Sequence, residues 1–322
     1  MPKARVAKPK KATKPKAVAR PPTETPPLAP PPAGATAPKA VRVATVSSVE
    51  SYLHAVQEHL EGMTVRWFRG HRVGSWALKP RLHREGALTK ENQIRDLFEQ
   101  NSPEHLPFRP QMYFDWLFVM QHYGAPTRLL DWTENPLVGL FFACIDRKEP
   151  IAVLVDGQPA IKMAELDGAV WALDPLKLNA SNKLFAQETA FVPFARQGLP
   201  NEDKGGTAKL GHYDLQGLIE RTRRPEIAAV GPLAVIGPRN TARMRAQQGA
   251  FTVFDEDGTA LDARGPTDGS HIFKFEIPHA VKPQIRRELD AIGINDMVLF
   301  PSLEQVGRHS ARIARGTTPG GE

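Results

Sequence analysis

One segment of the sequence gathers the residue types that bind and polarise ligands. Residues 121–144 read QHYGAPTRLLDWTENPLVGLFFAC, polar and aromatic in the first half and almost wholly apolar in the second. Gly124 and Pro126 fix the conformation of this stretch, so its side chains are held in place at low entropic cost. A cation, a hydroxyl, a carboxylate and aromatic faces on a stiff loop suit a nucleotide pocket. Alternatively, Arg128 satisfies the last carbonyls of the preceding helix and Asp131 anchors Arg128.

A second cluster, RWFRGH at residues 66–71, combines an arginine with a glycine at the end of an expected strand. The planar guanidinium of Arg69 suits a bidentate oxyanion such as phosphate or carboxylate. Gly70 would let a ligand approach the backbone closely. The structural alternative is a salt bridge at the rim of the sheet followed by a turn glycine.

A third cluster, NTARMRAQQGAFTVF, occupies residues 240–254. We expect a short helix that carries Arg243, Gln247 and Gln248 and breaks at Gly249 into a strand. This arrangement would place an amide side chain beside the start of the strand. An ordinary helix surface with a glycine cap is the alternative.

The sequence has none of the common signatures of catalysis or metal binding. It contains no GxxxxGK[ST], GxSxG or HExxH motif and no well-formed GxGxxG motif. No CxxC or HxxxH spacing is present, and the single cysteine, Cys144, excludes an internal disulfide. Asp115, Asp131 and Asp146 are not spaced as a carboxylate cluster for metal-dependent nuclease chemistry. We therefore expect no metal ion.

The N-terminal residues 1–42 differ in kind from the rest of the chain. They hold ten Lys or Arg and one acid, a charge of +9, whereas the whole chain carries +7, which leaves −2 for the other 280 residues. Frequent prolines and the lack of apolar periodicity predict a disordered, extended tail. Such a tail is an electrostatic handle for nucleic acid or another polyanion, or a solvated linker. The slightly acidic remainder argues against a domain built to coat DNA.

No stretch reaches the ~18 apolar residues needed to span a bilayer. The basic N-terminus has no apolar core behind it, so it does not resemble a secretory signal. We expect a cytoplasmic protein without a membrane association.

The pattern of elements predicts an α+β fold. Apolar periodicity and capping residues, above all Asn135 before Pro136, predict helices at 49–62, 91–100, 111–124, 136–146 and 282–294. Short β-branched and aromatic runs predict strands at 64–70, 151–155, 169–173, 227–236, 251–254, 271–277 and 296–300. We expect a single domain over 45–310 with a mixed, mainly antiparallel sheet flanked by helices, then a flexible tail at 311–322. The stretch 176–226 shows no clear pattern.

In their order along the chain, the clusters at residues 66–71, 121–144 and 240–254 resemble the FRG domain family, which is named for a Phe-Arg-Gly motif found here at residues 68–70. The resemblance extends over about residues 60–305, through QHYGAPTRLLDWTENPLVGLFFA, RMRAQQGAFTVF and IRRELDAIGINDMVLFPSLE. The family occurs in bacteria and phages and is largely of unknown function.

The RWFRGH cluster at residues 66–71 also resembles the opening motif of mono-ADP-ribosyltransferases of the Arg-Ser-Glu type. That resemblance implies NAD as a substrate, with Arg69 and Arg128 on its pyrophosphate and Thr127 bracing its nicotinamide half. Tyr123 or Trp132 would stack on a ring of the dinucleotide. The cofactor-binding set that the resemblance implies also includes Gly70, His122 and Gln247.

The late motif departs from that family. The Gln247–Gln248 turn would orient the acceptor, with Gln248 among the catalytic residues, but no Glu-x-Glu or Gln-x-Glu occurs near it. The missing glutamate normally stabilises the ribosyl cation. Asp131 is the first candidate to replace it, and Asp255 is the second.

The two resemblances together imply an NAD-dependent ADP-ribosyltransferase-like enzyme, a toxin or anti-phage defence effector that modifies protein or nucleic acid. An antitoxin or other regulatory protein would then be a partner. The alternative is a non-catalytic FRG sensor that binds a nucleotide or a nucleic-acid end. If the pocket exists, Arg69, Thr127, Arg128 and the Gln247–Gln248 turn should face one cavity, whose floor is the helix that begins near Asn135.

Overall fold

The computed structural model describes most of the chain from residue 41 to residue 315. The described ranges are 41–106, 108–145, 148–155, 158–185, 189–195, 210–213, 230–264, 266 and 268–315. The predicted N-terminal tail lies outside these ranges except for its last two residues. Much of 176–226, and the predicted C-terminal tail beyond residue 315, also lie outside them.

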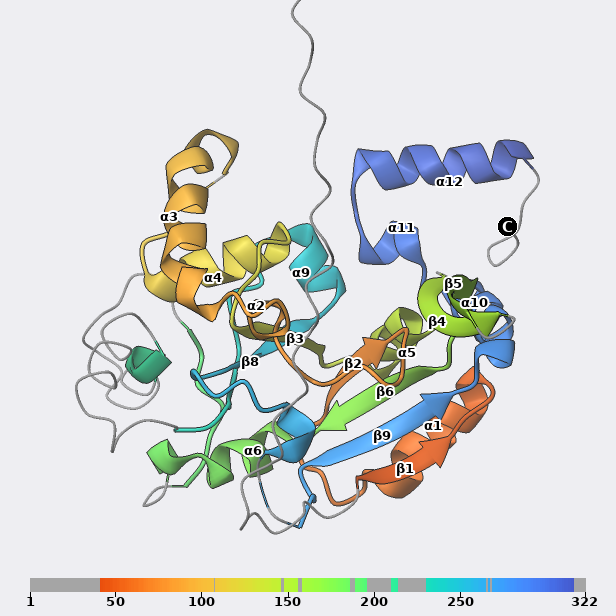
Figure 1. Cartoon of the computed structure of the whole chain (residues 1–322), viewed down its shortest axis with the longest axis horizontal. Coiled ribbons are helices and arrows are strands. Elements are labelled where there is room, and N and C mark those ends of the chain that lie inside the picture. Colours follow the sequence, from red (N-terminus) through yellow and green to blue (C-terminus); the bar gives the residue numbers. More distant parts are fainter. Residues whose placement is uncertain are drawn as a thin grey trace, which may run out of the picture. The chain divides into compact units, whose positions relative to one another are not determined.

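A seven-stranded sheet forms the centre of the described structure, with the strand order β1-β9-β6-β2-β3-β8-β7 (Figure 1). In that order the strands span Arg42–Thr45, Ile272–Ile277, Gly168–Leu173, Trp67–His71, Leu129–Thr133, Gly249–Val253 and Leu233–Val235. Among these strands only β1 and β9 run parallel. Strands β4 (Glu149–Val155) and β5 (Gln158–Ala164) form a separate antiparallel hairpin. The mixed, mainly antiparallel α+β fold is confirmed.

The sheet is nearly divided between β2 and β3. Over the described residues these two strands share one register pair, Phe68 with Thr133. By contrast, β2 pairs with β6 at five positions and β3 pairs with β8 at five positions. The sheet therefore consists of a four-stranded half, β1-β9-β6-β2, and a three-stranded half, β3-β8-β7, which diverge from a single point of contact.

Helices cover both halves of the sheet. They are α1 (Val49–His59), α2 (Arg81–Arg84), α3 (Glu91–Asn101), α4 (Tyr113–His122), α5 (Pro136–Ala143), α6 (Pro175–Ser181), α9 (Ala242–Ala246), α10 (Lys282–Ala291), α11 (Asp296–Leu299) and α12 (Leu303–Arg315). Single 3₁₀ turns occur at Leu88–Lys90, Pro103–His105, Lys183–Phe185, Gly211–Tyr213, Leu261–Ala263 and His279–Val281. None of the described helices is long and apolar enough to cross a membrane.

Helices form where the capping residues predicted them. Ser48 and Ser51 close a reciprocal capping box at the start of α1. The Asn135 side chain accepts a hydrogen bond from the Leu137 amide at the start of α5, with Pro136 in the first turn. The predicted helices that contain α1, α3, α4, α5 and α10 are all confirmed.

Three sequence expectations were wrong. The predicted strand at 296–300 is the short helix α11, because the Asn295 side chain caps the Val298 amide. The predicted loop at 129–133 is strand β3, which is buried on both faces except at Asp131 and so lacks the alternation of a half-buried strand. Strand β2 also continues past Gly70 to His71.

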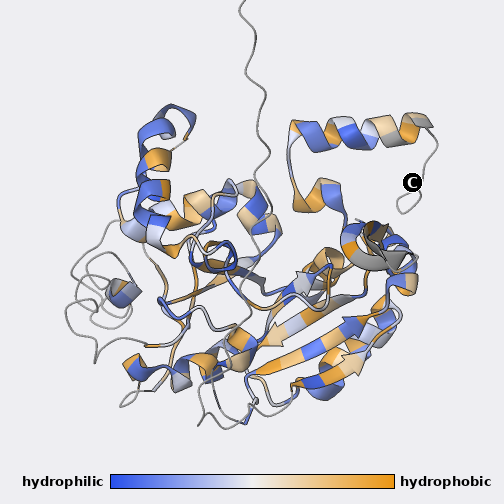
Figure 2. Ribbon diagram, viewed as in Figure 1, coloured by the Kyte–Doolittle hydropathy of each residue, from blue (hydrophilic) through white to orange (hydrophobic). Residues whose placement is uncertain are grey.

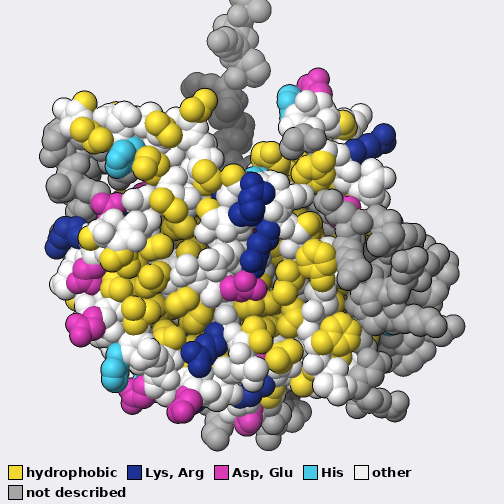
Figure 3. Space-filling model, turned by 180° about the vertical axis from the view of Figure 1, so that it is seen from behind, with side chains coloured by type: hydrophobic (Ala, Val, Ile, Leu, Met, Phe, Trp, Pro, Cys, Tyr) yellow, Lys and Arg dark blue, Asp and Glu magenta, His cyan; other side chains and the backbone are white. Residues whose placement is uncertain are grey.

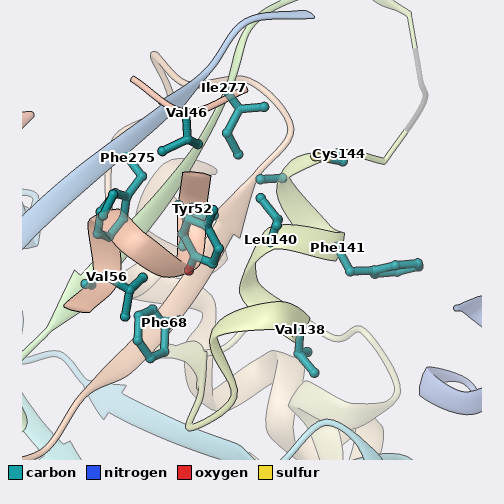
Figure 4. Close-up of a cluster of buried hydrophobic side chains, with 14 of the residues drawn as sticks. Val46, Tyr52, Val56, Phe68, Val138, Leu140, Phe141, Cys144, Phe275 and Ile277 are labelled. Carbon is teal, nitrogen blue, oxygen red and sulfur yellow. The ribbon is translucent and has the colours of Figure 1, made fainter. Parts of the chain in front are cut away.

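Three apolar clusters make up the core. One lies between the four-stranded half of the sheet and helices α1, α5 and α10, where Tyr52 meets the ring of Phe275 edge-on, and Phe68 belongs to the same cluster (Figure 4). A second joins α4 to β8 and β7, and a third fills the opposite face of the sheet around Trp67 and Trp132. Hydrophobic residues predominate along the strands accordingly (Figure 2).

Hydrophobic side chains also reach the surface, as over much of the face shown in Figure 3. Scattered exposure of this kind is common in folded proteins, and only contiguous unpartnered patches ask for an explanation. Exposed apolar side chains also lie on two helices, Leu97 on α3 and Leu303, Val306 and Ile313 on α12.

Candidate functional site

A cavity of about 260 Å³ lies where β2 and β3 diverge. Its walls come from β2, α4, β3, α5, α9 and β8. They are formed by Phe68, Arg69, Gly70, Phe118, Gln121, His122, Asp131, Trp132, Thr133, Phe142, Arg243, Met244, Gln247, Gly249 and Phe251. All three sequence clusters therefore reach one cavity, and α5 supplies part of its wall through Phe142.

Arg69 bridges the gap between the two halves of the sheet. Its Nη1 donates to the Asp131 carbonyl oxygen at 2.7 Å, where a strand neighbour would otherwise bind, and its Nε donates to His71 Nε2 at 3.0 Å. Burial lowers the pKa of Arg69 to about 10, so the guanidinium stays charged at neutral pH. Arg69 thus does two things: it closes the divided sheet and it presents a cation to the cavity.

Among the described residues that line the cavity, Asp131 is the one carboxylate. Its side chain is 52% exposed, and its Oδ2 lies 3.8 Å from Arg69 Nη1. Gln121 Nε2 donates to the same oxygen at 2.6 Å. The hydroxyl of Thr127 donates to Gln121 Oε1 at 2.5 Å, and it accepts from the Leu129 amide. Thr127 is fully buried and reaches the cavity only through Gln121.

The charge of the lining is positive. Arg243, on α9, adds a second guanidinium, which lies 4.9 Å from the centre of the Phe300 ring. In the described part of the lining, two arginines therefore face one carboxylate, Asp131. Burial and the neighbouring Arg243 lower the pKa of His122, so its imidazole adds no positive charge to the lining at neutral pH. The lining favours an anionic ligand.

The late glutamine turn is held in an uncommon conformation beside the cavity. Gln248 has a φ of 47°, in the left-handed region that few residues other than glycine adopt. The Thr133 hydroxyl donates to the Gln247 carbonyl at 2.6 Å, and the Glu134 amide donates to the Gln248 carbonyl at 3.1 Å. Gln247 lines the cavity and also donates through Nε2 to the Leu299 carbonyl, whereas Gln248 is not part of the lining.

Arg128 does not reach the cavity. Its guanidinium is fully buried and makes a two-pronged ion pair with Glu91, through Nε to Oε1 at 2.7 Å and through Nη2 to Oε2. Its Nη1 donates to the Phe254 carbonyl at 3.1 Å. The expectation that Thr127, Arg128 and Gln248 face a common cavity with Arg69 is therefore corrected. Arg69 and Gln247 do face it.

Three other predicted contact residues do not present their side chains to the cavity as expected, although Trp132 borders it. The indole of Trp132 is buried on the opposite face of β3 from Asp131, and its Nε1 donates to Thr252 Oγ1 at 3.1 Å. Tyr123 is exposed and lines a different hollow beside α3. Asp255, the second candidate for the missing glutamate, is fully buried in a salt bridge with Arg264.

Gly70 serves the packing of a helix. A Cβ built at this position would lie 2.1 Å from the Gly139 carbonyl oxygen and 2.5 Å from the Ala143 amide nitrogen, both on α5. The close approach that the glycine permits is therefore that of α5, although Gly70 also borders the cavity. The packing of α5 against β2, rather than the approach of a ligand, therefore explains why this position is a glycine.

Sequence reasoning overlooked Gln121, Thr133 and Phe142 and gave Arg243 no role. One signal was available for Arg243, because it precedes Gln247 by four positions and so shares a helix face with it. Phe142 carries no such signal, since a phenylalanine in an apolar helix usually belongs to the core. Among the described residues, no group of three or more His, Cys, Asp or Glu is placed to hold a metal ion.

Buried histidines make the fold sensitive to acid. Burial lowers the pKa of His71, His83, His122 and His271 below the ordinary value of about 6.5. Below that pH these histidines bind protons in the unfolded chain more readily than in the folded chain. The free energy of unfolding should therefore fall as the pH drops below about 6.5, by up to about 1.4 kcal/mol per pH unit for each histidine.

The contribution of one histidine can be isolated by urea titration at a series of pH values from 7 to 5. His71→Gln keeps an acceptor for Arg69 and should flatten the slope by up to about 1.4 kcal/mol per pH unit. His54→Gln, at an exposed position on α1, should leave the slope unchanged. An unaltered slope in His71→Gln would mean that His71 does not remain neutral in the fold.

Comparison with known sequence families identifies part of the chain. Residues 65–151 match the sequence model of the FRG domain family. The matched stretch contains β2, β3 and α5, and with them Arg69 and Asp131, whereas the glutamine turn lies beyond it. No curated protein and no solved structure matches the chain.

Proposed function

We propose, from the premise that this chain carries an FRG domain, that its cavity binds the phosphate-bearing part of NAD and that the protein is an ADP-ribosyltransferase-like enzyme. The observation that carries the proposal is the adjacency of three strands. Strands β2, β3 and β8 follow one another in the sheet, and each brings one of the sequence clusters to the same positively charged cavity. The order of the three clusters along the chain matches the order of the three motifs in the mono-ADP-ribosyltransferases.

The proposal changes the assignment of the cations. Arg69 and Arg243 hold the phosphate groups, and Arg243 takes the part first given to the buried Arg128. Arginine suits this part because its guanidinium binds phosphate oxygens through two parallel hydrogen bonds. Gln247 lies across the cavity as the late polar residue.

Asp131 takes the place of the missing glutamate. When the bond between C1′ and nicotinamide breaks, the electron pair leaves with nicotinamide and positive charge develops on the ribose. A half-exposed carboxylate in the wall of the cavity would stabilise that charge. An acceptor oxygen or nitrogen on protein or nucleic acid then bonds to C1′ and gives up its proton.

The size of the cavity limits how much of the dinucleotide enters it. Its 260 Å³ is below the range of about 300–1,000 Å³ for pockets that enclose drug-sized ligands. The cavity therefore suits the nicotinamide-ribose-phosphate half, with the adenosine half lying outside.

A non-catalytic sensor of nucleotides is the second candidate. It is favoured by the state of Asp131, whose carboxylate is already engaged by Gln121 and Arg69, and by the absence of an acid at the Gln247–Gln248 turn. The same two arginines would bind the ligand, and no bond would be broken.

One set of measurements separates the two candidates. Binding of NAD, ADP-ribose and AMP to the purified full-length chain is followed by calorimetry, and nicotinamide release is followed by chromatography with and without a cell lysate as the source of acceptor. Arg243→Gln should weaken binding of all three ligands by about tenfold or more, the scale of one hydrogen bond to a charged group. Arg245→Gln, on the same helix but outside the cavity, is the matched control and should change binding less than twofold.

Asp131→Asn should keep ligand binding and lose nicotinamide release. Binding by the wild-type protein without any release of nicotinamide would favour the sensor. Failure of all three phosphate ligands to bind would overturn both candidates.

The biological role belongs to the same proposal. A cytoplasmic toxin or anti-phage defence effector would modify a protein or nucleic-acid acceptor, under control of an antitoxin or another regulatory protein. The charge of +9 on residues 1–42 supports an affinity for polyanions in that setting.

A further inference from the structure

Asp131 and Arg69 form a loose ion pair in the cavity. Asp131 Oδ2 lies 3.8 Å from Arg69 Nη1, about an ångström longer than a hydrogen bond between charged groups. Among the described residues, Arg69 is the one cation within ion-pair distance of this carboxylate. The Asp131 side chain is half-exposed and turns about χ1 and χ2, so direct contact with the guanidinium lies within its reach. A third group must therefore hold the carboxylate back.

Gln121 is that group. Its Nε2 donates at 2.6 Å to Asp131 Oδ2, the same oxygen that faces Arg69. Gln121 is half-buried in the last turn of α4 and lines the cavity beside Asp131. A neutral amide binds a carboxylate without cancelling its charge, whereas a guanidinium in direct contact cancels it. The hydrogen bond from Gln121 therefore fixes Asp131 and leaves it negative.

The amide of Gln121 has one orientation, because both of its ends are specified. The Leu129 amide donates to Thr127 Oγ1 at 3.1 Å, and the hydroxyl proton of Thr127 is donated to Gln121 Oε1 at 2.5 Å. A hydroxyl that donates requires the amide oxygen on its side. An ionised carboxylate only accepts, so Asp131 requires the amide nitrogen on the other side. Thr127 thus sets the orientation in which Gln121 binds Asp131.

The separation leaves the guanidinium of Arg69 available to a ligand. Its Nη1 donates to the Asp131 carbonyl and its Nε donates to His71, while no described residue binds its Nη2. A carboxylate in direct contact would occupy the remaining donors and cancel the charge that attracts an anion. The same contact would cancel the negative charge of Asp131. One contact pair would therefore disable both charged groups.

We propose that Gln121, oriented by Thr127, is a positioning residue that keeps the Asp131 carboxylate out of direct contact with Arg69. The cavity then presents a cation and an anion that a ligand can use separately. The inference rests on the proposed binding of phosphate by Arg69. It applies to an enzyme and to a sensor alike, because both need the free guanidinium. Thr127 acts through Gln121, since it does not line the cavity itself.

The test is a double-mutant cycle on the affinity for ADP-ribose, measured by calorimetry with the purified full-length chain at pH 7. Gln121→Leu should weaken binding about fivefold, the effect of one partly exposed ion pair, because Asp131 then contacts Arg69. Asp131→Asn cannot form that pair and should bind ADP-ribose at least as tightly as the wild type. In the Asp131→Asn background, Gln121→Leu should therefore change the affinity by less than about twofold.

Three further variants separate this role from packing. Thr127→Val keeps a similar shape without the hydroxyl, so the amide loses its fixed orientation and binding should weaken by about twofold or more. Tested in the same two backgrounds, it repeats the cycle without changing Gln121. Thr127→Ser keeps a hydroxyl and should recover most of the loss. Gln111→Leu makes the matched change at an exposed glutamine outside the cavity and should leave the affinity unchanged. Circular dichroism verifies that each variant is folded.

The outcomes distinguish the inference from the function on which it rests. An equal loss of affinity from Gln121→Leu in both backgrounds would overturn the inference, because Gln121 would then contact the ligand or brace the loop in its own right. An unchanged affinity in Gln121→Leu would overturn it as well, with the proposed function left standing. A wild-type protein that binds neither ADP-ribose nor AMP would overturn the proposed function, and the inference with it.

Discussion

Glu91→Gln is expected to lower the free energy of unfolding by about 3–5 kcal/mol. The substitution removes the two-pronged carboxylate partner of the buried Arg128 guanidinium and leaves it the Glu256 carboxylate, 3.6 Å from Nη1, and the Phe254 carbonyl. A buried charge that loses its main partner cannot regain the hydration that it lost on folding. Chemical denaturation of the purified protein measures the effect.

A surface pair provides the comparison. Glu85→Gln removes the exposed partner of Arg81 and should cost no more than about 1 kcal/mol. The double variant Arg128→Met with Glu91→Leu replaces both charges by apolar groups and should be more stable than Glu91→Gln. If Glu91→Gln kept full stability and only ligand binding fell, Arg128 would be a ligand residue after all.

Gly70→Ala is expected to cost about 3 kcal/mol or more, at or above the upper end of the usual range for overpacking. The added methyl would lie 2.1 Å from the Gly139 carbonyl oxygen, and neither backbone can yield without moving α5 away from β2. The shift would also disturb Phe142 in the cavity wall. Thermal unfolding measures the loss, and ligand binding should fall with it.

Gly62→Ala is the matched control, because a Cβ at Gly62 has nothing within 4 Å. Its effect should stay within about 0.5 kcal/mol. Equal stability of the two variants would show that α5 does not rest directly on β2.

The sequence predicted the elements that local chemistry specifies. Asn135 and Pro136 mark the start of α5 because a side-chain cap and a fixed φ act within a few residues. It missed β3, because a strand covered on both faces has no alternation to detect. At residues 296–300 the sequence predicted a strand from β-branched and apolar residues. The structure has a helix there, because the Asn295 side chain caps its first turn.

The sequence predicted which segments form the site, but it did not predict which side chains face the cavity. The three clusters meet at one cavity, but the face to which each residue points depends on pairing with distant strands. Asp131 and Trp132 are neighbours in sequence and lie on opposite sides of β3. The burial of Arg128 depends on Glu91, 37 positions away, and no local pattern announces such a partner.

Because β2 and β3 share a single register pair, the two halves of the sheet are joined less tightly to each other than the strands within each half. Each half is braced by full ladders, so any rotation of one half against the other concentrates at the seam. Arg69 acts there as a latch through its bond to the Asp131 carbonyl. An anion that binds the guanidinium of Arg69 would break its hydrogen bond to the Asp131 carbonyl. We therefore expect ligand binding in the cavity and the angle between the two half-sheets to be thermodynamically linked.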